Sequence, residues 1–282
     1  MSSLKSSVLF AINCLILSTL SISAYSSGQD KPETQGQLFL GGTGAAIGAL
    51  KIFGKLFEES HPNVSITVYP SLGSGGGIRA LQANKLSVAF TSRPLKEDEQ
   101  KQGLLATEII RTPFVFVTHP DINVDSLSLD EIALLLSGQT KQWADGTLVR
   151  PVLRPLYDAD SKIVMNISPS LAESLKIAHQ RSGKNIAATD YDSANELERI
   201  NGSIGTTTML LIRAENRRLN ILALDKVAPN LENFTSGRYP YGKSIYAVTP
   251  ETTKPLAKQF IKFLKAQETQ QQILKLASLP VQ

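Results

Sequence analysis

The chain has 282 residues, of which 42% are hydrophobic, 19% charged and 6% aromatic, and its formal net charge is +4. This length suits one large domain or two of ordinary size, and the composition is that of a globular protein. The Lys and Arg residues form no long run and aromatic residues are few, so we expect no nucleic acid among the partners.

The N-terminus has the pattern of a secretory signal. Lys5 is followed by an apolar run from Val8 to Leu20 and then by small residues up to Ala24, the order that signal peptides share. The run is shorter than the roughly 20 residues that a spanning helix needs. We therefore expect a signal peptide over residues 1–24 and a periplasmic or otherwise extracytoplasmic mature protein.

The single cysteine, Cys14, lies inside that apolar run. Asn13 precedes it where a lipid-attachment site needs a small residue, so a lipoprotein is not the favoured form. The mature chain then has no cysteine and can form neither disulfides nor thiolate metal sites. We expect no cofactor and no bound metal.

Short apolar runs alternate with amphipathic stretches along the first hundred residues. Strands are expected at residues 38–40, in "VSITVYP" and in "SVAFTS". Helices are expected over residues 46–59, where apolar residues recur every three or four positions, and in "GIRALQANK". This alternation predicts an α/β fold with a largely parallel sheet.

The rest of the chain continues the pattern after a long apolar segment, "IIRTPFVFVTHP". Ser128 and Glu131 form a capping box that opens the helix "LDEIALLLSG", which Gly138 ends. Strands are expected in "VRPVLRPL", "SIGTTTMLLI", "NILALD" and "SIYAVTP", and a last helix over residues 254–277. The same spacing predicts two more helix caps, at Ser170 with Glu173 and at Ser193 with Glu196.

Two glycine-rich stretches, "LGGTGAAIGAL" and "SLGSGGGIR", each join a predicted strand to a predicted helix. In the second, the helix is expected to begin near Gly76 with Ser74 close to its N-cap. Unsatisfied N–H groups and the positive end of the helix dipole make such a turn an anion site if it faces a cleft, and an ordinary tight turn if it does not. Two junctions on neighbouring parallel strands would lie side by side at the carboxyl edge of the sheet, where open α/β sheets bind ligands.

Sequence motifs for enzymatic chemistry fail on inspection. "GRYPYGKS" fits the phosphate-loop pattern, but its Tyr and Pro residues stiffen the loop and the following "IYAV" is β-like, so we interpret it as a chance match. The dinucleotide pattern fails at Ile47, where a third glycine is needed. The three histidines are scattered and no nucleophile–base pair is evident. We therefore do not expect an enzyme.

Seven segments, taken in order, resemble the phosphate-type solute-binding proteins of ABC transporters. They are "GGTGAAIGAL", "GSGGGIRAL", "SVAFTSRPL", "LSLDEIALLLSGQTKQWADG", "VLRPLYDADS", "GSIGTTTMLLI" and "GRYPYGKSIYAVTP". The resemblance implies a bilobed type II periplasmic-binding fold, with lobe 1 formed by residues 36–115 plus 244–282 and lobe 2 by residues 116–243. It also implies a monomer that captures a small inorganic oxyanion, phosphate before others, and delivers it to an ABC permease in the cytoplasmic membrane.

In that family the anion contacts the first helix N-terminus, the glycine-rich turn, the loop after the third strand, and an arginine of the second lobe. The resemblance places the corresponding ligand-binding residues at Ala46, Ile47, Ser74, Gly75, Gly76, Ser92, Arg93, Arg154, Asp158 and Ser161.

This sequence departs from the family pattern at three places. Ala46 stands for a threonine, Ser92 stands for a carboxylate, and "YDADS" replaces a Ser-Gly-Thr triplet. A carboxylate accepts a hydrogen bond from protonated phosphate and repels a fully deprotonated oxyanion, so Asp158 or Asp160 would have to fill that role. Arg93 either reaches the anion with bidentate hydrogen bonds or pairs with a surface carboxylate.

Plainer interpretations stay open. Thr43, Ser74 and Ser92 could be ordinary turn residues, and Arg154 could belong to a structural ion pair. The ligand could be sulfate, molybdate or tungstate. The same fold could also serve as a sensing or interaction module that signals to a membrane partner. An exported phosphatase would need a nucleophile or metals that the sequence does not reveal.

Overall fold

The computed structural model describes residues 36–281. The expected signal peptide and Cys14 lie outside these residues. Among the described residues, none of the helices combines the length and apolar character that a transmembrane segment requires.

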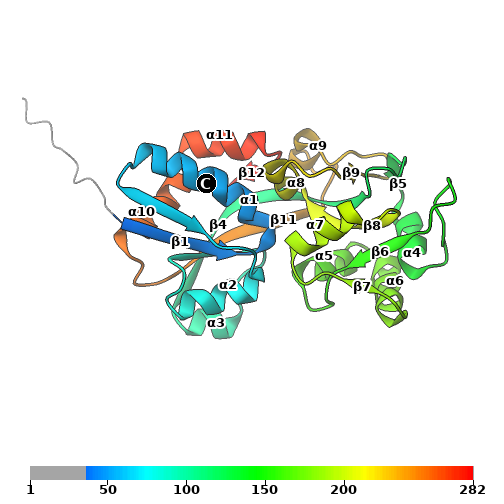
Figure 1. Ribbon diagram of the computed structural model, residues 1–282, viewed down its shortest axis with the longest axis horizontal. Helices are drawn as coiled ribbons and strands as arrows, with labels where there is room; N and C mark the ends of the chain where they lie inside the picture. The colour runs from blue at the N-terminus through cyan, green and yellow to red at the C-terminus, as the bar shows by residue number, and fades with distance from the viewer. Residues whose placement is uncertain (1–35, 282) are drawn as a thin grey trace, which may run out of the picture. The chain divides into compact units, whose positions relative to one another are not determined.

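Strands and helices alternate along the chain (Figure 1). The strands are β1 (Gly36–Gly42), β2 (Val64–Val68), β3 (Val88–Thr91), β4 (Leu104–Thr118), β5 (Ser126–Leu127), β6 (Arg150–Leu153), β7 (Asn185–Ile186), β8 (Ser203–Thr208), β9 (Asn220–Ile221), β10 (Ala223–Leu224), β11 (Gly242–Pro250) and β12 (Leu279–Pro280). The helices are α1 (Gly44–Ser60), α2 (Gly73–Gln82), α3 (Glu97–Lys101), α4 (Leu129–Ser137), α5 (Ala159–Ile167), α6 (Pro169–Gln180), α7 (Asp190–Arg199), α8 (Met209–Glu215), α9 (Leu231–Thr235), α10 (Pro255–Leu264) and α11 (Gln267–Lys275).

The main sheet has the strand order β2-β1-β3-β11-β4-β8-β6-β7, and β12 and β9 also pair with β4. The long strand β4 is shared by two half-sheets, because its residues 104–113 pair with β11 and its residues 114–118 pair with β8. We call β1, β2, β3, β11 and residues 104–113 the first half-sheet, and residues 114–118, β6, β7 and β8 the second half-sheet.

The sheet is mixed, which corrects the expectation of a largely parallel sheet. β1 is parallel to β2 and β3, and β6 is parallel to β7 and β8. However, β11 runs antiparallel to β3 and β4, and β4 runs antiparallel to β8. The reason is that β4 and β11 carry the chain from one half-sheet to the other and back, which the local strand–helix alternation does not reveal.

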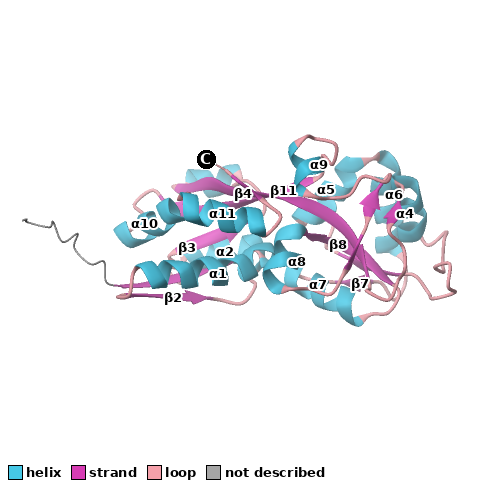
Figure 2. Cartoon of the chain, turned by 90° about the horizontal axis from the view of Figure 1, so that it is seen from above, coloured by secondary structure: helices cyan, strands magenta, loops and turns pink. Residues whose placement is uncertain are grey.

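Helices cover both faces of each half-sheet (Figure 2). In β3, Val88 and Phe90 join the cluster under α1, α10 and α11, whereas Ala89 faces α2. In β4, Phe114 and Phe116 pack with α4, α5 and α6, whereas residues 115 and 117 pack with α7 and α8. Successive strand residues therefore bury opposite faces, and each fully buried phenylalanine contributes roughly 1.5–3 kcal/mol.

The helix ends test the sequence expectations directly. The capping box of α4 is confirmed: Ser128 Oγ accepts a hydrogen bond from the Glu131 N–H, and Gly138 ends the helix in the left-handed region with φ +80°. The other two predicted caps are wrong. Ser168 caps α6, since Pro169 fixes the first helical residue, and Thr189 caps α7 together with Asp192.

Two further segments differ from expectation. The segment "SIGTTTMLLI" was expected to be one strand, but only its first part is β8, because Thr208 caps α8 by accepting from the Leu211 N–H. The expected helix over residues 254–277 is two helices, α10 and α11, separated where Ala266 takes an extended conformation.

The two glycine-rich junctions meet, as the sequence predicted. A Cβ atom on Gly77 would lie 2.7 Å from the Cα atom of Gly42, so α2 packs directly on the end of β1. Helix α2 begins at Gly73, earlier than expected, with Leu72 at the N-cap. Ser74 therefore lies in the first turn of the helix and not at its cap.

Candidate functional site

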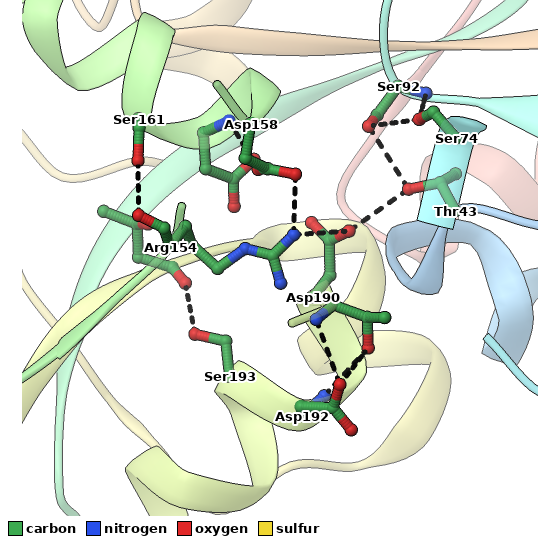
Figure 3. A network of polar contacts seen from close by, with 12 residues as sticks. Thr43, Ser74, Ser92, Arg154, Asp158, Ser161, Asp190, Asp192 and Ser193 are labelled. Atoms are coloured by element: carbon green, nitrogen blue, oxygen red, sulfur yellow. Dashed lines mark hydrogen bonds and ion pairs between the residues drawn. The ribbon is translucent and has the colours of Figure 1, made fainter. Parts of the chain in front are cut away.

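Three hydroxyl groups converge where β1, β3 and α2 meet. Thr43 follows β1, Ser92 follows β3, and Ser74 lies in the first turn of α2. Ser92 Oγ is 3.2 Å from both Thr43 Oγ1 and Ser74 Oγ, and the Ser92 N–H donates to Ser74 Oγ at 3.0 Å (Figure 3). The structure thus brings predicted residues Ser74 and Ser92 together and adds Thr43.

Thr43 occupies the N-cap position of α1, yet its side chain makes no capping hydrogen bond to its own helix. Its hydroxyl instead lies 3.2 Å from Asp190 Oδ2, on the first residue of α7. A hydroxyl has one hydrogen to donate, and a carboxylate is the stronger acceptor of the two oxygens nearby. Thr43 therefore donates to Asp190 and is left to accept from Ser92.

A buried ion cluster lies next to these hydroxyls. Lys243 Nζ, at the start of β11, donates to the carboxylates of Asp160 and Asp190. The side chains of Lys243 and Asp160 are each 1% exposed, and that of Asp190 is 4% exposed. Charges buried this deeply persist only when they are paired and hydrogen-bonded.

Arg154 extends the cluster from the loop after β6. Its Nη2 donates to Asp158 Oδ2 at 2.9 Å and lies 4.0 Å from Asp190 Oδ2. Its backbone carbonyl accepts from Ser161 Oγ at 2.9 Å and lies 3.0 Å from His179 Nε2. The backbone is therefore held on one side while the guanidinium reaches into the cluster (Figure 3).

The cluster holds the pKa values of its two most buried carboxyl groups on opposite sides of their ordinary value. Burial, together with the nearby Asp190 and Asp158, raises the pKa of Asp160 to about 7 against the opposing charges of Lys243 and Arg154. Burial also acts to raise the pKa of Asp190, but Lys243, Arg154 and the Thr43 hydrogen bond outweigh it and lower that pKa to about 2. Asp190 is thus the fixed negative charge, and Asp160 is the group that titrates near neutral pH.

Some buried polar atoms of the cluster have no hydrogen-bond partner within residues 36–281. They are Nε and Nη1 of Arg154 and Oδ2 of Asp160. Arg154 is only 4% exposed, and a buried donor without an acceptor is costly. The site can therefore supply two N–H donors and one carboxyl oxygen to a small polar ligand.

The remaining predicted residues contribute less to this arrangement. Arg93 has its guanidinium in a two-pronged pair with Glu99, at 2.6 and 2.7 Å, as in the structural alternative for this residue. The Ala46 N–H donates to the Thr43 carbonyl at 3.2 Å, and the Ile47 side chain is buried. Gly75 and Gly76 lie in the first turn of α2 beside the guanidinium of Arg79. Ser161 and Asp158 face Arg154, as described above.

Sequence reasoning missed Lys243 and Asp190. Lys243 is the lysine of the "GRYPYGKS" segment, and the rejection of a phosphate loop is confirmed, because a strand and not a helix follows it. One signal was available: Lys243, Ile245 and Ala247 alternate on the buried side of β11, and a lysine on a buried face needs a carboxylate partner. Asp190 carried no comparable signal, because the helix it begins was assigned a later start.

Comparison with known proteins gives one family match. The family described as "PBP superfamily domain" matches residues 27–268. The "Phosphate-binding protein PstS" of Bacillus subtilis (strain 168) is 24% identical over 258 residues, which covers 88% of this chain and 81% of that protein.

Two solved structures share the fold. One is a putative phosphate ABC transporter substrate-binding protein with bound phosphate from Clostridium perfringens, with a TM-score of 0.73, 20% identity, and coverage of 88% of this chain and 100% of that chain. The other is a phosphate-binding protein from Stenotrophomonas maltophilia, with a TM-score of 0.64, 12% identity, and coverage of 88% of this chain and 91% of that chain.

Proposed function

The chain belongs to the PBP superfamily, and on this basis we propose that it is an extracytoplasmic solute-binding protein that captures a small oxyanion, most of all phosphate, for an ABC permease. The relatives named above are phosphate-binding proteins. The proposal includes the signal peptide over residues 1–24, a monomeric mature protein, and binding without hydrolysis.

The observation that carries the proposal is the guanidinium of Arg154. It is buried, and two of its nitrogens have no partner among the described residues. Arginine donates parallel hydrogen bonds to the oxygens of a tetrahedral anion. The hydroxyls of Ser74 and Ser92 lie across the same cluster and would contact other oxygens of the anion (Figure 3).

We assign the two sides of the site to two lobes, residues 36–115 plus 244–282 and residues 116–243. Ser74 and Ser92 then come from lobe 1, and Arg154 comes from lobe 2. An anion between them would hold the lobes together. The separate hydrophobic clusters of the two half-sheets support this division.

Asp160 supplies the acceptor that distinguishes phosphate from sulfate. Its Oδ2 atom is buried without a partner among residues 36–281. Near neutral pH phosphate still carries a proton, which an ionised carboxylate accepts, whereas sulfate has no proton to give. This assignment replaces the carboxylate that Ser92 lacks.

Isothermal titration of the purified mature protein with phosphate, sulfate, molybdate and tungstate tests the proposal. We expect phosphate to bind most tightly. Ser74→Ala should weaken binding about ten- to a hundred-fold, since it removes a hydrogen bond to a charged group worth roughly 1.5–3 kcal/mol, and Arg154→Ala should weaken it at least as much. Arg150→Ala is the matched control, because Arg150 lies on the same strand with an exposed side chain. Neither heat nor a thermal shift with any of the four anions would contradict the proposal.

A second candidate function is a sensing module of the same fold. The cluster holds three carboxylates and two cations, Arg154 and Lys243, which is a more negative surrounding than an oxyanion favours. Folded protein that binds none of the four anions would favour this candidate. Hydrolysis of a phosphomonoester by the pure protein would contradict both.

A further inference from the structure

We propose that the carboxylate of Asp190 acts as an internal anion that holds the site closed without a ligand, and that an entering oxyanion must displace it from Thr43. This inference rests on the oxyanion site proposed above. It concerns a residue outside the predicted ligand contacts and gives that residue a competing role.

The first observation is the packing of two helix N-termini. A Cβ atom on Gly44, the first residue of α1, would lie 2.7 Å from the Tyr191 backbone nitrogen and 3.2 Å from the Asp190 Cβ. The positive ends of α1 and α7 therefore meet, and the Asp190 carboxylate lies beside both. A negative charge at a helix N-terminus is stabilising, so Asp190 already provides what an external anion would provide.

The second observation is the set of contacts that fix this carboxylate. Lys243 donates to one oxygen, and the Thr43 hydroxyl lies 3.2 Å from the other. Arg154 Nη2 is 4.0 Å from that second oxygen while Nε and Nη1 have no partner among the described residues. Asp190 therefore takes part of the positive charge of Arg154 and leaves the remaining donors for a ligand.

The third observation is that the Thr43–Asp190 contact joins distant parts of the chain. Thr43 precedes α1 on the first half-sheet, and Asp190 begins α7 on the second, 147 positions later. Thr43 gives up the cap of its own helix to make this contact. The hydrogen bond thus links the two proposed lobes where an oxyanion would otherwise link them.

Competition follows from this geometry. A ligand that approaches the N-terminus of α1 meets a carboxylate already bound there, and like charges cannot share the place. The measured affinity is then the intrinsic affinity reduced by the fraction of molecules in which Asp190 has released Thr43. Removing the carboxylate should open the ligand-free protein and tighten anion binding.

Small-angle scattering and titration with inorganic phosphate test this on the full mature protein. We expect the ligand-free and phosphate-saturated wild type to have the same radius of gyration. Asp190→Asn should be larger than wild type when ligand-free, should contract with phosphate, and should bind phosphate about tenfold more tightly, within the usual range of coupling between sites. Asp192→Asn is the charge-matched control, since Asp192 lies in the same first turn and bonds to Thr189 instead.

Thr43 gives an independent pair of variants if Asp190→Asn fails to fold. Thr43→Val removes the hydroxyl and keeps the shape, so it should expand the ligand-free protein. Thr43→Ser keeps the hydroxyl and should match wild type. Equal radii of gyration for wild type, Asp190→Asn and Thr43→Val would overturn the proposal, and so would unchanged or weaker phosphate binding by an expanded Asp190→Asn. If wild type and Asp190→Asn both expand or stay closed as stated but neither binds any oxyanion, the proposed function fails, and the scattering alone decides whether Asp190 closes the site.

Discussion

Gly77 of α2 packs directly on Gly42 of β1, where a Cβ atom on Gly77 would lie only 2.7 Å from the Gly42 Cα. Gly42 is itself confined, because its φ is +131° and its own Cβ would lie 2.0 Å from the Phe90 carbonyl oxygen. This double constraint brings Ser74 and Ser92 to one place. The glycines of both junctions thus set the position of the candidate site.

Gly77→Ala should therefore destabilise the protein. The added methyl group meets backbone and forces α2 away from β1, and overpacking of this kind costs about 1–3 kcal/mol. Gly75→Ala is the matched control, since its Cβ would meet only the flexible end of Arg79 at 3.5 Å. That control should be neutral or stabilise the helix by up to about 1 kcal/mol. Urea denaturation measures both, and equal free energies of unfolding for the two variants would contradict the packing argument.

A second prediction separates two serines at the start of α6. Ser168 Oγ accepts from the Leu171 N–H, whereas Ser170 lies inside the helix with an exposed side chain. Ser168→Ala should lower the free energy of unfolding by about 1 kcal/mol. Ser170→Ala should change it by less than about 0.5 kcal/mol. If the larger loss belongs to Ser170→Ala, the cap is misplaced.

These serines illustrate how far the sequence reached. Strand and helix identity followed from apolar spacing, and the meeting of the two glycine-rich junctions followed from their shared position after parallel strands. Helix starts were less secure, because several Ser and Thr residues near each start could serve as caps, and the proline at 169 decided one of them.

The ion cluster lay beyond sequence reasoning for a different physical reason. Lys243, Asp160 and Asp190 come from three separate elements, and their meeting depends on β11 crossing between the half-sheets. Local patterns report which face of an element is buried, but they do not report which buried faces meet. Arg154 was predicted only through resemblance, and its unpartnered nitrogens required coordinates.

Lys243 should be the most sensitive position of the cluster. Lys243→Met keeps much of the side-chain length but leaves Asp160 and Asp190 facing one another without their shared cation. Breaking a buried pair in this way costs roughly 3–5 kcal/mol. Lys51→Met, at an exposed position of α1, should change stability by less than about 0.5 kcal/mol.

A double variant distinguishes lost charge pairing from lost packing at Lys243. Adding Asp160→Asn to Lys243→Met removes one of the two unpaired carboxylates and should restore part of the stability, because neighbouring residues are energetically coupled. Chemical denaturation of the single and double variants measures the coupling. Additive losses would mean that Lys243 and Asp160 act independently, contrary to their contact.

Asp160 should make the stability of the protein depend on pH. Its pKa is raised from its ordinary value of 3.8 to about 7, so between these values the folded protein keeps a proton that the unfolded chain has released. The stability from this group is fully present below the unfolded pKa and is lost as pH rises to the folded pKa, at up to about 1.4 kcal/mol per pH unit. Above that pH its contribution no longer changes.

Asp160→Asn should remove this slope, because an amide does not titrate. We expect the free energy of unfolding of wild type, minus that of the variant, to fall steadily as pH rises between the two pKa values and then to level off. Taking the difference cancels the contributions of the three histidines, which both proteins share. Asp192→Asn, a carboxylate of α7 outside the cluster, should leave the wild-type slope in place. Parallel stability curves for wild type and Asp160→Asn across that pH interval would show that Asp160 is ionised throughout, and the raised pKa would be wrong.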